Sequence, residues 1–160
     1  SRIFNKIKMF KNQGRSIQGT GGDDNHIIRG SNLRLTNLQA AIGLSQLKKI
    51  KKRAKLLRSH YLYYKSNLNK KIKLFDFRDE ELPLWTDAYF VERDKLLSNL
   101  YKKSIDCRKF WKPMGQQKSY VNKIKIDAYF KNLFWLPSSF NLNILKKKYI
   151  CKSINEYILK

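Results

Sequence analysis

The residues best suited to chemistry lie together in the segment that leads into a strong helix start. His26, Arg29, Asn32 and Arg34 follow a glycine-rich stretch and come directly before that helix. A loop that ends at a helix N-terminus offers backbone N–H groups to an anion, and these side chains add further donors. Two interpretations stay open: the residues bind an anionic ligand, or they only tie the loop to the helix.

Other kinds of reactive centre are hard to build from this sequence. It contains no Gly-x-Ser-x-Gly elbow, no Walker phosphate loop and no Rossmann glycine fingerprint. The acidic residues at 23–24 and 79–81 lie in turn-like surroundings, and we interpret them as solvated. Cys107 and Cys151 are far apart, without a CxxC pattern or a paired histidine. No metal site is therefore expected, and both cysteines are predicted to be ordinary unpaired thiols.

The charge balance of the chain is strongly basic: 35 Lys and Arg stand against 12 Asp and Glu, a formal net charge of +23. Such a surplus is typical of proteins that bind nucleic acid, anionic membranes or phosphorylated molecules. A compositional explanation is that AT-rich codons filled a solvated surface with Lys. The excess of Lys over Arg favours it, because phosphate-binding surfaces use bidentate Arg. A basic nucleic-acid-binding module remains the alternative, recognisable by exposed aromatic and basic side chains interleaved on one face.

The composition predicts a folded protein of about one domain. Hydrophobic residues make up 42% and aromatic residues 13% of the 160 residues, too many for a disordered chain. No apolar run approaches the ~20 residues that a membrane span needs, and the first residues show no signal-peptide pattern. We therefore expect a cytoplasmic protein without a membrane partner.

Hydrophobic spacing in the first half predicts a helix over 2–12, a long loop over 14–30 and one continuous helix from about 37 to 68. Thr36 and Gln39 form the sequence pattern of a capping box, which marks the start of the long helix. The first third of this helix is apolar nearly all round, as in a helix buried inside a protein. The remainder carries a single apolar stripe: Leu47, Ile50, Ala54, Leu57, Tyr61, Tyr64 and Leu68.

The second half has shorter elements. The sequence predicts a strand over 84–92, a helix over 93–103, an extended piece over 105–110, helical turns over 125–132 and a buried strand over 133–136. Ser138 or Ser139 is expected to cap a final helix with one apolar face. The fold class is therefore α+β.

The segment from 26 to 47 also carries a dense motif, whose members are His26, Gly30, Asn32, Arg34 and the run Thr36–Leu47. It closely resembles the H-x-x-x-G-x-N-Y-R-x-T-N-x-Q-A-A-I-G-L-x-Q-L segment of the DegT/DnrJ family of sugar aminotransferases, the perosamine-synthase type in particular. Segments 10–14, 105–114 and 136–139 resemble further family motifs in the same order. The resemblance covers nearly the whole chain, with Leu33 in place of the family's tyrosine.

The resemblance implies a pyridoxal 5'-phosphate (PLP) enzyme of the aspartate-aminotransferase fold, fold type I. Such an enzyme transfers an amino group from glutamate to a keto nucleotide sugar for polysaccharide biosynthesis, and works as a homodimer with its active sites at the subunit interface. Asn32 matches a residue that reaches across the dimer toward the cofactor phosphate. His26 and Arg34 match loop or substrate contacts.

No lysine in this sequence matches the family's Schiff-base lysine, which lies upstream of the matched region, so no catalytic residue is assigned. The resemblance therefore implies a C-terminal portion: residues 1–35 as the end of the large domain with its active-site loop, and 36–160 as a long connecting helix and a small α/β domain. Its expected partners are the missing N-terminal half or a second copy, and we expect the chain alone to be inactive. No specific nucleic-acid partner is expected.

Overall fold

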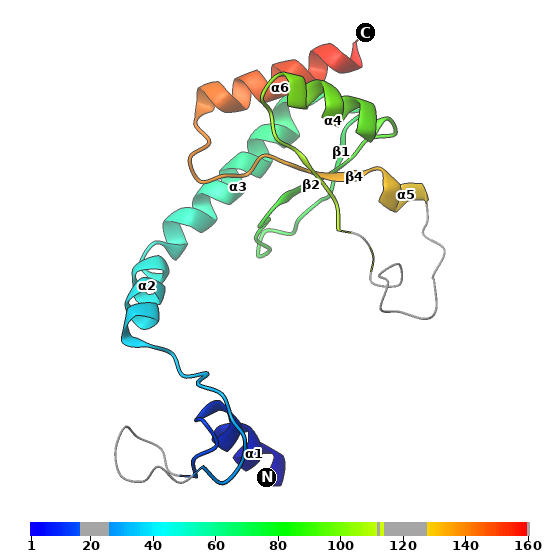
Figure 1. Cartoon of the computed structure of the whole chain (residues 1–160). Coiled ribbons are helices and arrows are strands. Elements are labelled where there is room, and N and C mark those ends of the chain that lie inside the picture. The colour runs from blue at the N-terminus through cyan, green and yellow to red at the C-terminus, as the bar shows by residue number, and fades with distance from the viewer. Residues whose placement is uncertain (17–25, 112, 114–127, 160) are drawn as a thin grey trace. The chain divides into compact units, whose positions relative to one another are not determined.

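The computed structural model describes residues 1–16, 26–111, 113 and 128–159 of the chain (Figure 1). The chain divides into two compact units, Ser1–Lys49 and Ile50–Lys160. Among the described residues, no helix combines the length and apolar character needed to cross a membrane.

The first unit contains two helices, both of which begin with a side-chain cap. Helix α1 spans Arg2–Lys11, and the hydroxyl of Ser1 accepts a hydrogen bond from the N–H of Phe4 at 3.3 Å. Helix α2 spans Asn37–Leu47. The predicted capping box is confirmed: Thr36 Oγ1 accepts from the Gln39 N–H at 3.2 Å, and Gln39 Oε1 accepts from the Thr36 N–H at 3.0 Å.

The predicted continuous helix over 37–68 is wrong, because the structure divides it between Leu47 and Ile50. Helix α3 spans Ile50–Asn67. The N–H of Lys48 still donates to the carbonyl of Leu44, but that of Lys49 donates to Gln46 in the tighter i→i−3 pattern. This pattern ends an α-helix. The lysine run at 48–52 also places like charges four residues apart, which disfavours an uninterrupted helix.

The apolar first part of the predicted helix is α2, and its expected burial is not found within this chain. None of its residues is buried. Leu38 is 72% exposed and Ile42 54% exposed. A Cβ added at Gly43 would meet no atom within 4 Å. The helix therefore forms as predicted while its apolar surface stays uncovered.

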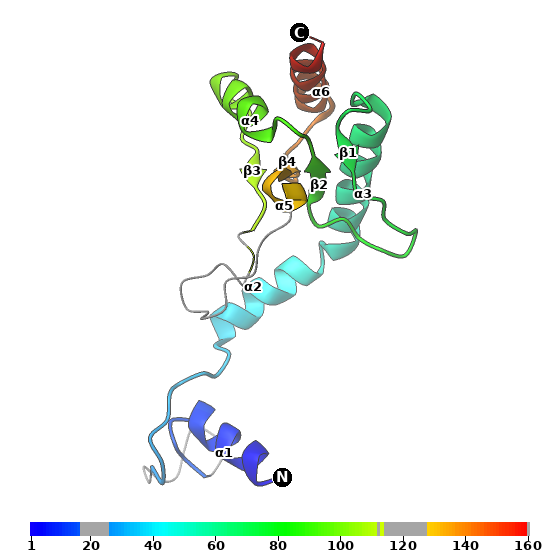
Figure 2. The ribbon, with the colours of Figure 1, turned by 90° about the vertical axis from the view of Figure 1, so that its right-hand side faces the viewer.

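The second unit is built on a four-stranded antiparallel sheet of order β1-β2-β4-β3 (Figure 2). Its strands are β1 (Lys73–Leu74), β2 (Thr86–Tyr89), β3 (Arg108–Lys109) and β4 (Leu133–Leu136). The helices of this unit are α3, α4 (Arg93–Lys102), α5 (Ala128–Lys131) and α6 (Ile144–Ile158). The structure confirms the predicted helix over 93–103 and the buried strand over 133–136. The predicted strand over 84–92 is shorter, since only Thr86–Tyr89 pairs, and the extended piece over 105–110 contains β3. The structure also confirms the helical turns at 128–131, while 125–127 lie outside the described residues.

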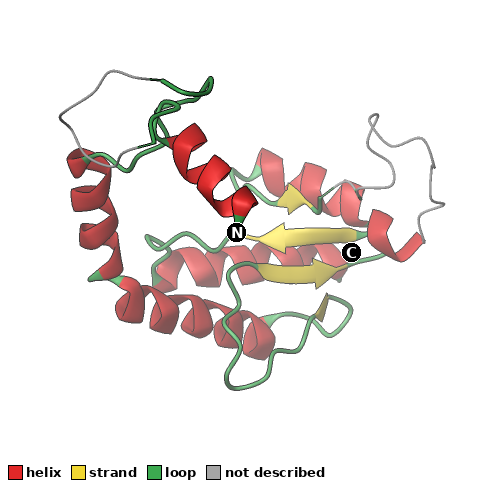
Figure 3. Cartoon of the chain, turned by 90° about the horizontal axis from the view of Figure 1, so that it is seen from below, coloured by secondary structure: helices red, strands yellow, loops and turns green. Residues whose placement is uncertain are grey.

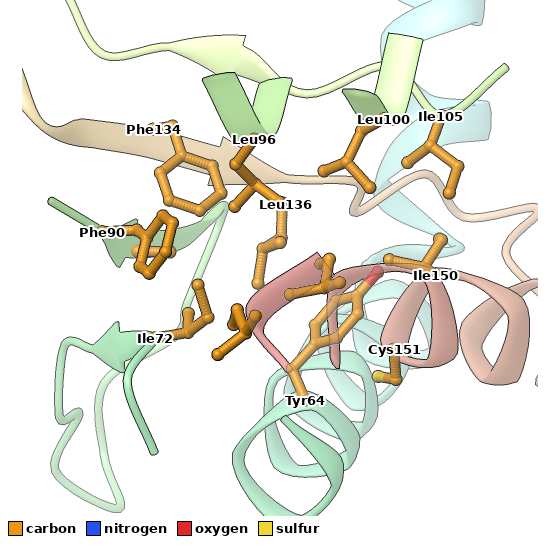
Figure 4. Packing of buried hydrophobic residues seen from close by; sticks show 13 residues of the cluster. Tyr64, Ile72, Phe90, Leu96, Leu100, Ile105, Phe134, Leu136, Ile150 and Cys151 are labelled. Carbon is orange, nitrogen blue, oxygen red and sulfur yellow. The ribbon is translucent and has the colours of Figure 1, made fainter. Parts of the chain in front are cut away.

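The core of this unit lies between one face of the sheet and helices α3, α4 and α6 (Figures 3 and 4). Phe134 and Leu136 of β4 belong to this core, together with Tyr64 of α3 and Ile154 of α6. Successive strand residues point to opposite faces, so Trp135 lies on the face away from these helices.

The apolar stripe of α3 is buried only in its second half. Leu57, Tyr61 and Tyr64 are buried, whereas Ile50 is 55% exposed, so the expected burial of Ile50 is wrong. The stripe is joined by an unexpected residue, His60, which is 1% exposed. Burial, and then the charge of Lys147, lower the pKa of His60.

The last helix begins at a different cap from the one predicted. The side chain of Asn143, not Ser138 or Ser139, caps α6 by accepting from the Lys146 N–H at 2.9 Å. Ser139 instead organises the preceding turn, since its hydroxyl accepts from the N–H of Asn141 at 3.3 Å.

The two cysteines are unpaired, as predicted. Burial raises the pKa of the Cys107 thiol to about 12, with a smaller contribution from Asp106, and burial raises that of Cys151 to about 11. Both thiols are therefore weak nucleophiles in the folded unit.

Candidate functional site

The predicted loop is closed at its base by backbone hydrogen bonds between the end of α1 and the segment before α2. The N–H of Gln13 donates to Ser31 O at 3.1 Å, and that of Ser31 donates to Phe10 O at 2.7 Å. The N–H of Leu33 donates to Lys11 O at 3.0 Å. These bonds join residues 10–13 to residues 31–33, about twenty positions away in the sequence, and we call this pairing the clamp. The clamp fixes the backbone that carries the candidate residues.

Two glycines allow this close approach. Gly14 has a φ of +84°, and an added Cβ would lie 1.8 Å from the carbonyl oxygen of Ile28. A Cβ at Gly30 would lie 2.2 Å from the backbone nitrogen of Gly14. Both obstructing atoms belong to the backbone, so neither position accepts a side chain without opening the clamp.

Asn32 lies in this clamp, and its side chain is at the surface. Its backbone forms a bridge with Asn12, which is only 6% exposed, while Asn32 itself is exposed. The carboxamide is thus carried by a fixed backbone and remains accessible to a ligand. Arg34, two residues further on, is half-buried.

His26 is tied to the same clamp. Its Nδ1 lies 2.6 Å from the carbonyl oxygen of Gln13. A carbonyl oxygen only accepts, so Nδ1 carries the proton and Nε2 is the acceptor nitrogen of the neutral ring. The first unit therefore brings His26 and Asn32 to one loop base. The glycines at 19, 21 and 22 and the acidic pair at 23–24 lie outside the described residues.

Sequence reasoning missed a basic hollow beside the clamp. It has a volume of about 330 Å³ and is lined by Asn5, Lys8, Met9, Asn12, Arg15 and Ser16. The available signal was the spacing of Lys8 and Asn12, which lie one turn apart at the end of α1. Its lysine, arginine and amide groups suit an anion.

Several solved structures of aminotransferases share this fold. A DegT/DnrJ/EryC1/StrS aminotransferase from Brucella abortus superposes with a TM-score of 0.80 at 16% identity, over 100% of this chain and 44% of that one. Helicobacter pylori PseC, an aminotransferase involved in the biosynthesis of pseudoaminic acid, superposes with a TM-score of 0.76 at 24% identity. This match covers 98% of this chain and 46% of PseC. The PLP form of Spr1654 from Streptococcus pneumoniae, a putative sugar aminotransferase, superposes with a TM-score of 0.77 at 17% identity. This match covers 97% of this chain and 43% of Spr1654. These likenesses confirm the predicted α+β fold of fold type I.

The DegT/DnrJ/EryC1/StrS aminotransferase family model matches residues 1–155, and the chain belongs to this family. The GDP-perosamine synthase of Escherichia coli O157:H7 is 29% identical over 164 residues, which cover 97% of this chain and 44% of the relative. The chain thus spans less than half the length of the curated relative that it matches. The predicted resemblance to this family is confirmed.

Members of the family depend on PLP, which supplies an electron sink for chemistry at the amino carbon when bound. The residues of this chain fit one part of that cofactor. The exposed carboxamide of Asn32 can donate an N–H to a phosphate oxygen from a clamped backbone. The resemblance assigns no lysine of this chain to the Schiff base, so the fit is limited to the phosphate end.

Proposed function

We propose that this chain is the C-terminal portion of a nucleotide-sugar aminotransferase that uses PLP to move an amino group from glutamate to a keto nucleotide sugar. Residues 1–35 form the end of the large domain with its active-site loop, and 36–160 form the connecting helices and the small domain. The enzyme acts in the cytoplasm as a homodimer, in polysaccharide biosynthesis. The chain alone is inactive, because the Schiff-base lysine belongs to the other part of the enzyme.

The apolar surface of α2 carries this proposal. Leu38, Ile42, Leu44 and Leu47 are each more than half exposed, and they surround the helix rather than forming one stripe. An apolar helix of this kind is stable in water only when other protein covers it. The rest of the polypeptide and a second copy of the enzyme are the covering surfaces in the homodimer that we propose.

The residues of the loop base act by binding and positioning. Asn32 donates its amide N–H to the cofactor phosphate of the neighbouring subunit. His26 holds the loop through its Nδ1–H and Gln13, which leaves Nε2 to accept a hydrogen bond from a sugar hydroxyl. Arg34 contributes a guanidinium beside the same loop, suited to an anionic part of the substrate.

The test restores the upstream half of the enzyme and compares it with the 160-residue chain. The restored dimer is expected to form the PLP absorbance band of a lysine adduct and to transaminate, whereas the isolated chain does neither. Asn32→Ala is expected to weaken PLP retention about tenfold, as loss of a charge-assisted hydrogen bond implies. Asn141→Ala, which removes an exposed amide in the second unit, is the matched control and leaves retention unchanged.

Two results would overturn this proposal. One is a borohydride-reducible PLP adduct at a single lysine of the isolated chain. The other is full PLP retention by the Asn32 variant of the restored dimer, because it would remove the role assigned to the loop base.

A further inference from the structure

The second unit contains a hollow of about 460 Å³ between the end of α4, the segment that follows β4 and one face of α6. Its apolar lining consists of Ile105, Pro137, Leu142 and Ile150. Ile105 and Ile150 also belong to the core, and both lie at the same end of it in Figure 4. The floor of the hollow is therefore held by the folded core, and its volume falls within the roughly 300–1,000 Å³ of small-molecule pockets.

Ser104 lines this hollow and has a backbone conformation that serine rarely adopts. Its φ is +57°, in the left-handed region. The N–H of Ser104 donates to Tyr101 O at 2.9 Å, as in the Schellman motif that ends many helices. The second bond of this motif runs from the N–H of Ile105 to Leu100 O at 2.9 Å. Glycine is the usual residue at this position, so serine costs stability while it adds a hydroxyl group to the hollow.

Two oppositely charged side chains, Asp106 and Lys146, line the same hollow. Both are exposed, and neither forms an ion pair with the other or with any further residue that the structure describes. In a chain with a net charge of +23, the unpaired carboxylate is the more unusual of the two. An unpaired carboxylate and an unpaired ammonium in one hollow suit a ligand that carries both charges.

Helix α6 places an aromatic ring next to this ammonium. Lys146, Tyr149 and Ile150 all line the hollow, and their spacing of three and four residues puts them on one face of the helix. The side chain of Tyr149 is 50% exposed, and its hydroxyl donates to Lys103 O at 3.3 Å. This bond holds the ring in place, so that it forms a flat apolar wall beside Lys146.

We propose that this hollow binds a free amino acid with a large apolar side chain. The α-carboxylate of the ligand binds Lys146, and its α-ammonium donates to Asp106 and to the hydroxyl of Ser104. The side chain of the ligand packs on the ring of Tyr149 and on the apolar floor. A simple anion would use neither Asp106 nor the floor, and glutamate would place a second carboxylate against apolar surface. Phenylalanine is therefore the preferred probe.

The residues of this hollow all belong to the second unit, whereas His26 and Asn32 belong to the first. Binding requires neither PLP nor transamination. Its failure would leave the proposed function standing, and failure of transamination would leave this hollow standing.

The experiment titrates the 160-residue chain, followed by calorimetry, with L-phenylalanine and three analogues. N-acetyl-L-phenylalanine lacks the ammonium, phenethylamine lacks the carboxylate, and L-glutamate lacks the apolar side chain. Phenylalanine is expected to bind at one site. Each analogue should bind at least about fivefold more weakly, since each loses one of the three interactions.

Variants of the charged groups assign the two ends of the ligand. Lys146→Gln should weaken phenylalanine binding about five- to tenfold and leave phenethylamine unchanged, because phenethylamine has no carboxylate. Lys148→Gln is the matched control, since Lys148 is an exposed lysine of α6 that does not line the hollow. Asp106→Asn should weaken phenylalanine to a similar degree without weakening N-acetylphenylalanine.

Ser104→Gly separates binding from folding. Glycine relieves the left-handed backbone, so the thermal stability of the chain should not fall. Phenylalanine binding should nevertheless weaken about threefold, because the hydroxyl is lost. A binding loss without a stability loss cannot result from misfolding.

Four outcomes would overturn the proposal. The first is the absence of saturable phenylalanine binding at millimolar concentrations. The second is N-acetylphenylalanine binding as tightly as phenylalanine, which would indicate the C-terminus of a peptide. The third is glutamate binding as tightly, which would leave only charge. The fourth is an equal loss in the variants of Lys146 and Lys148.

Discussion

Replacing Gly30 with alanine tests whether the loop base depends on close backbone contact. The new Cβ would lie 2.2 Å from the nitrogen of Gly14 and 2.6 Å from the carbonyl carbon of Gln13. Overpacking typically costs 1–3 kcal/mol, and here the obstructing atoms are backbone that cannot rotate away. We therefore expect the clamp to be destabilised by about 2–3 kcal/mol.

Amide hydrogen exchange measures this loss directly. The N–H groups of Gln13, Ser31 and Leu33 are bonded across the clamp, so their protection reports its opening. A loss of 2–3 kcal/mol lowers protection roughly 30- to 150-fold, since each 1.4 kcal/mol is a factor of ten. Amides of the core strand β4 should be unaffected, because the core lies in the other unit.

Gly43→Ala is the matched control. It lies inside α2, where an added Cβ meets nothing within 4 Å, and alanine is the better helix former by about 1 kcal/mol. It should therefore stabilise the helix slightly and leave the clamp amides unchanged. Unchanged protection of Ser31 in the Gly30 variant, or equal effects of both alanines, would refute the steric reasoning.

Two further predictions concern the second unit. Leu57→Ala should lower the free energy of unfolding by about 2–4 kcal/mol because Leu57 is buried, whereas Ile50→Ala should cost under about 1 kcal/mol because Ile50 is more than half exposed; urea denaturation compares them, and equal losses would contradict the burial of α3. The folded pKa of His60 lies below its unfolded value, so the unfolded chain binds the proton more readily and stability falls as pH drops below about 6.5. His60→Asn should lose less stability than the unchanged chain between pH 7.5 and 5.5, and parallel losses would show that other groups cause the acid sensitivity.

Elements specified by adjacent residues were predictable from the sequence. The capping box joins Thr36 and Gln39, which are only three positions apart. The four consecutive apolar residues of β4 indicate a buried strand without any knowledge of its neighbours. Strand β1 was not predictable, because two residues carry no periodicity and Leu74 is a strand residue only through its pairing with Ala88. The break after α2 likewise depends on a local change of hydrogen bonding that apolar spacing does not register.

The candidate site was predictable only in its residue types. The sequence singled out His26 and Asn32, but the bond from His26 to Gln13 joins residues 13 apart. A hollow lined by Trp85, Arg108 and Trp135 on the outer face of the sheet was missed for a related reason. Trp85, Arg108 and Trp135 come from three separate segments, and only the order of the strands brings them together. The Ser138 and Ser139 prediction failed because four residues suited to capping precede α6, and only the last of them caps it: Ser138, Ser139, Asn141 and Asn143.

The uncovered apolar surface of α2 also has a consequence for biosynthesis. The ribosome delivers residues 1–49 before the 111 residues from Ile50 to Lys160. At about 5–20 residues per second, synthesis of these 111 residues takes roughly 6–22 s, and they leave α2 uncovered in the folded chain. Throughout that interval its leucines and isoleucine stay exposed to solvent, which favours association with other chains. We expect chaperones to bind chains whose synthesis is arrested after residue 90, because this apolar surface is then already complete.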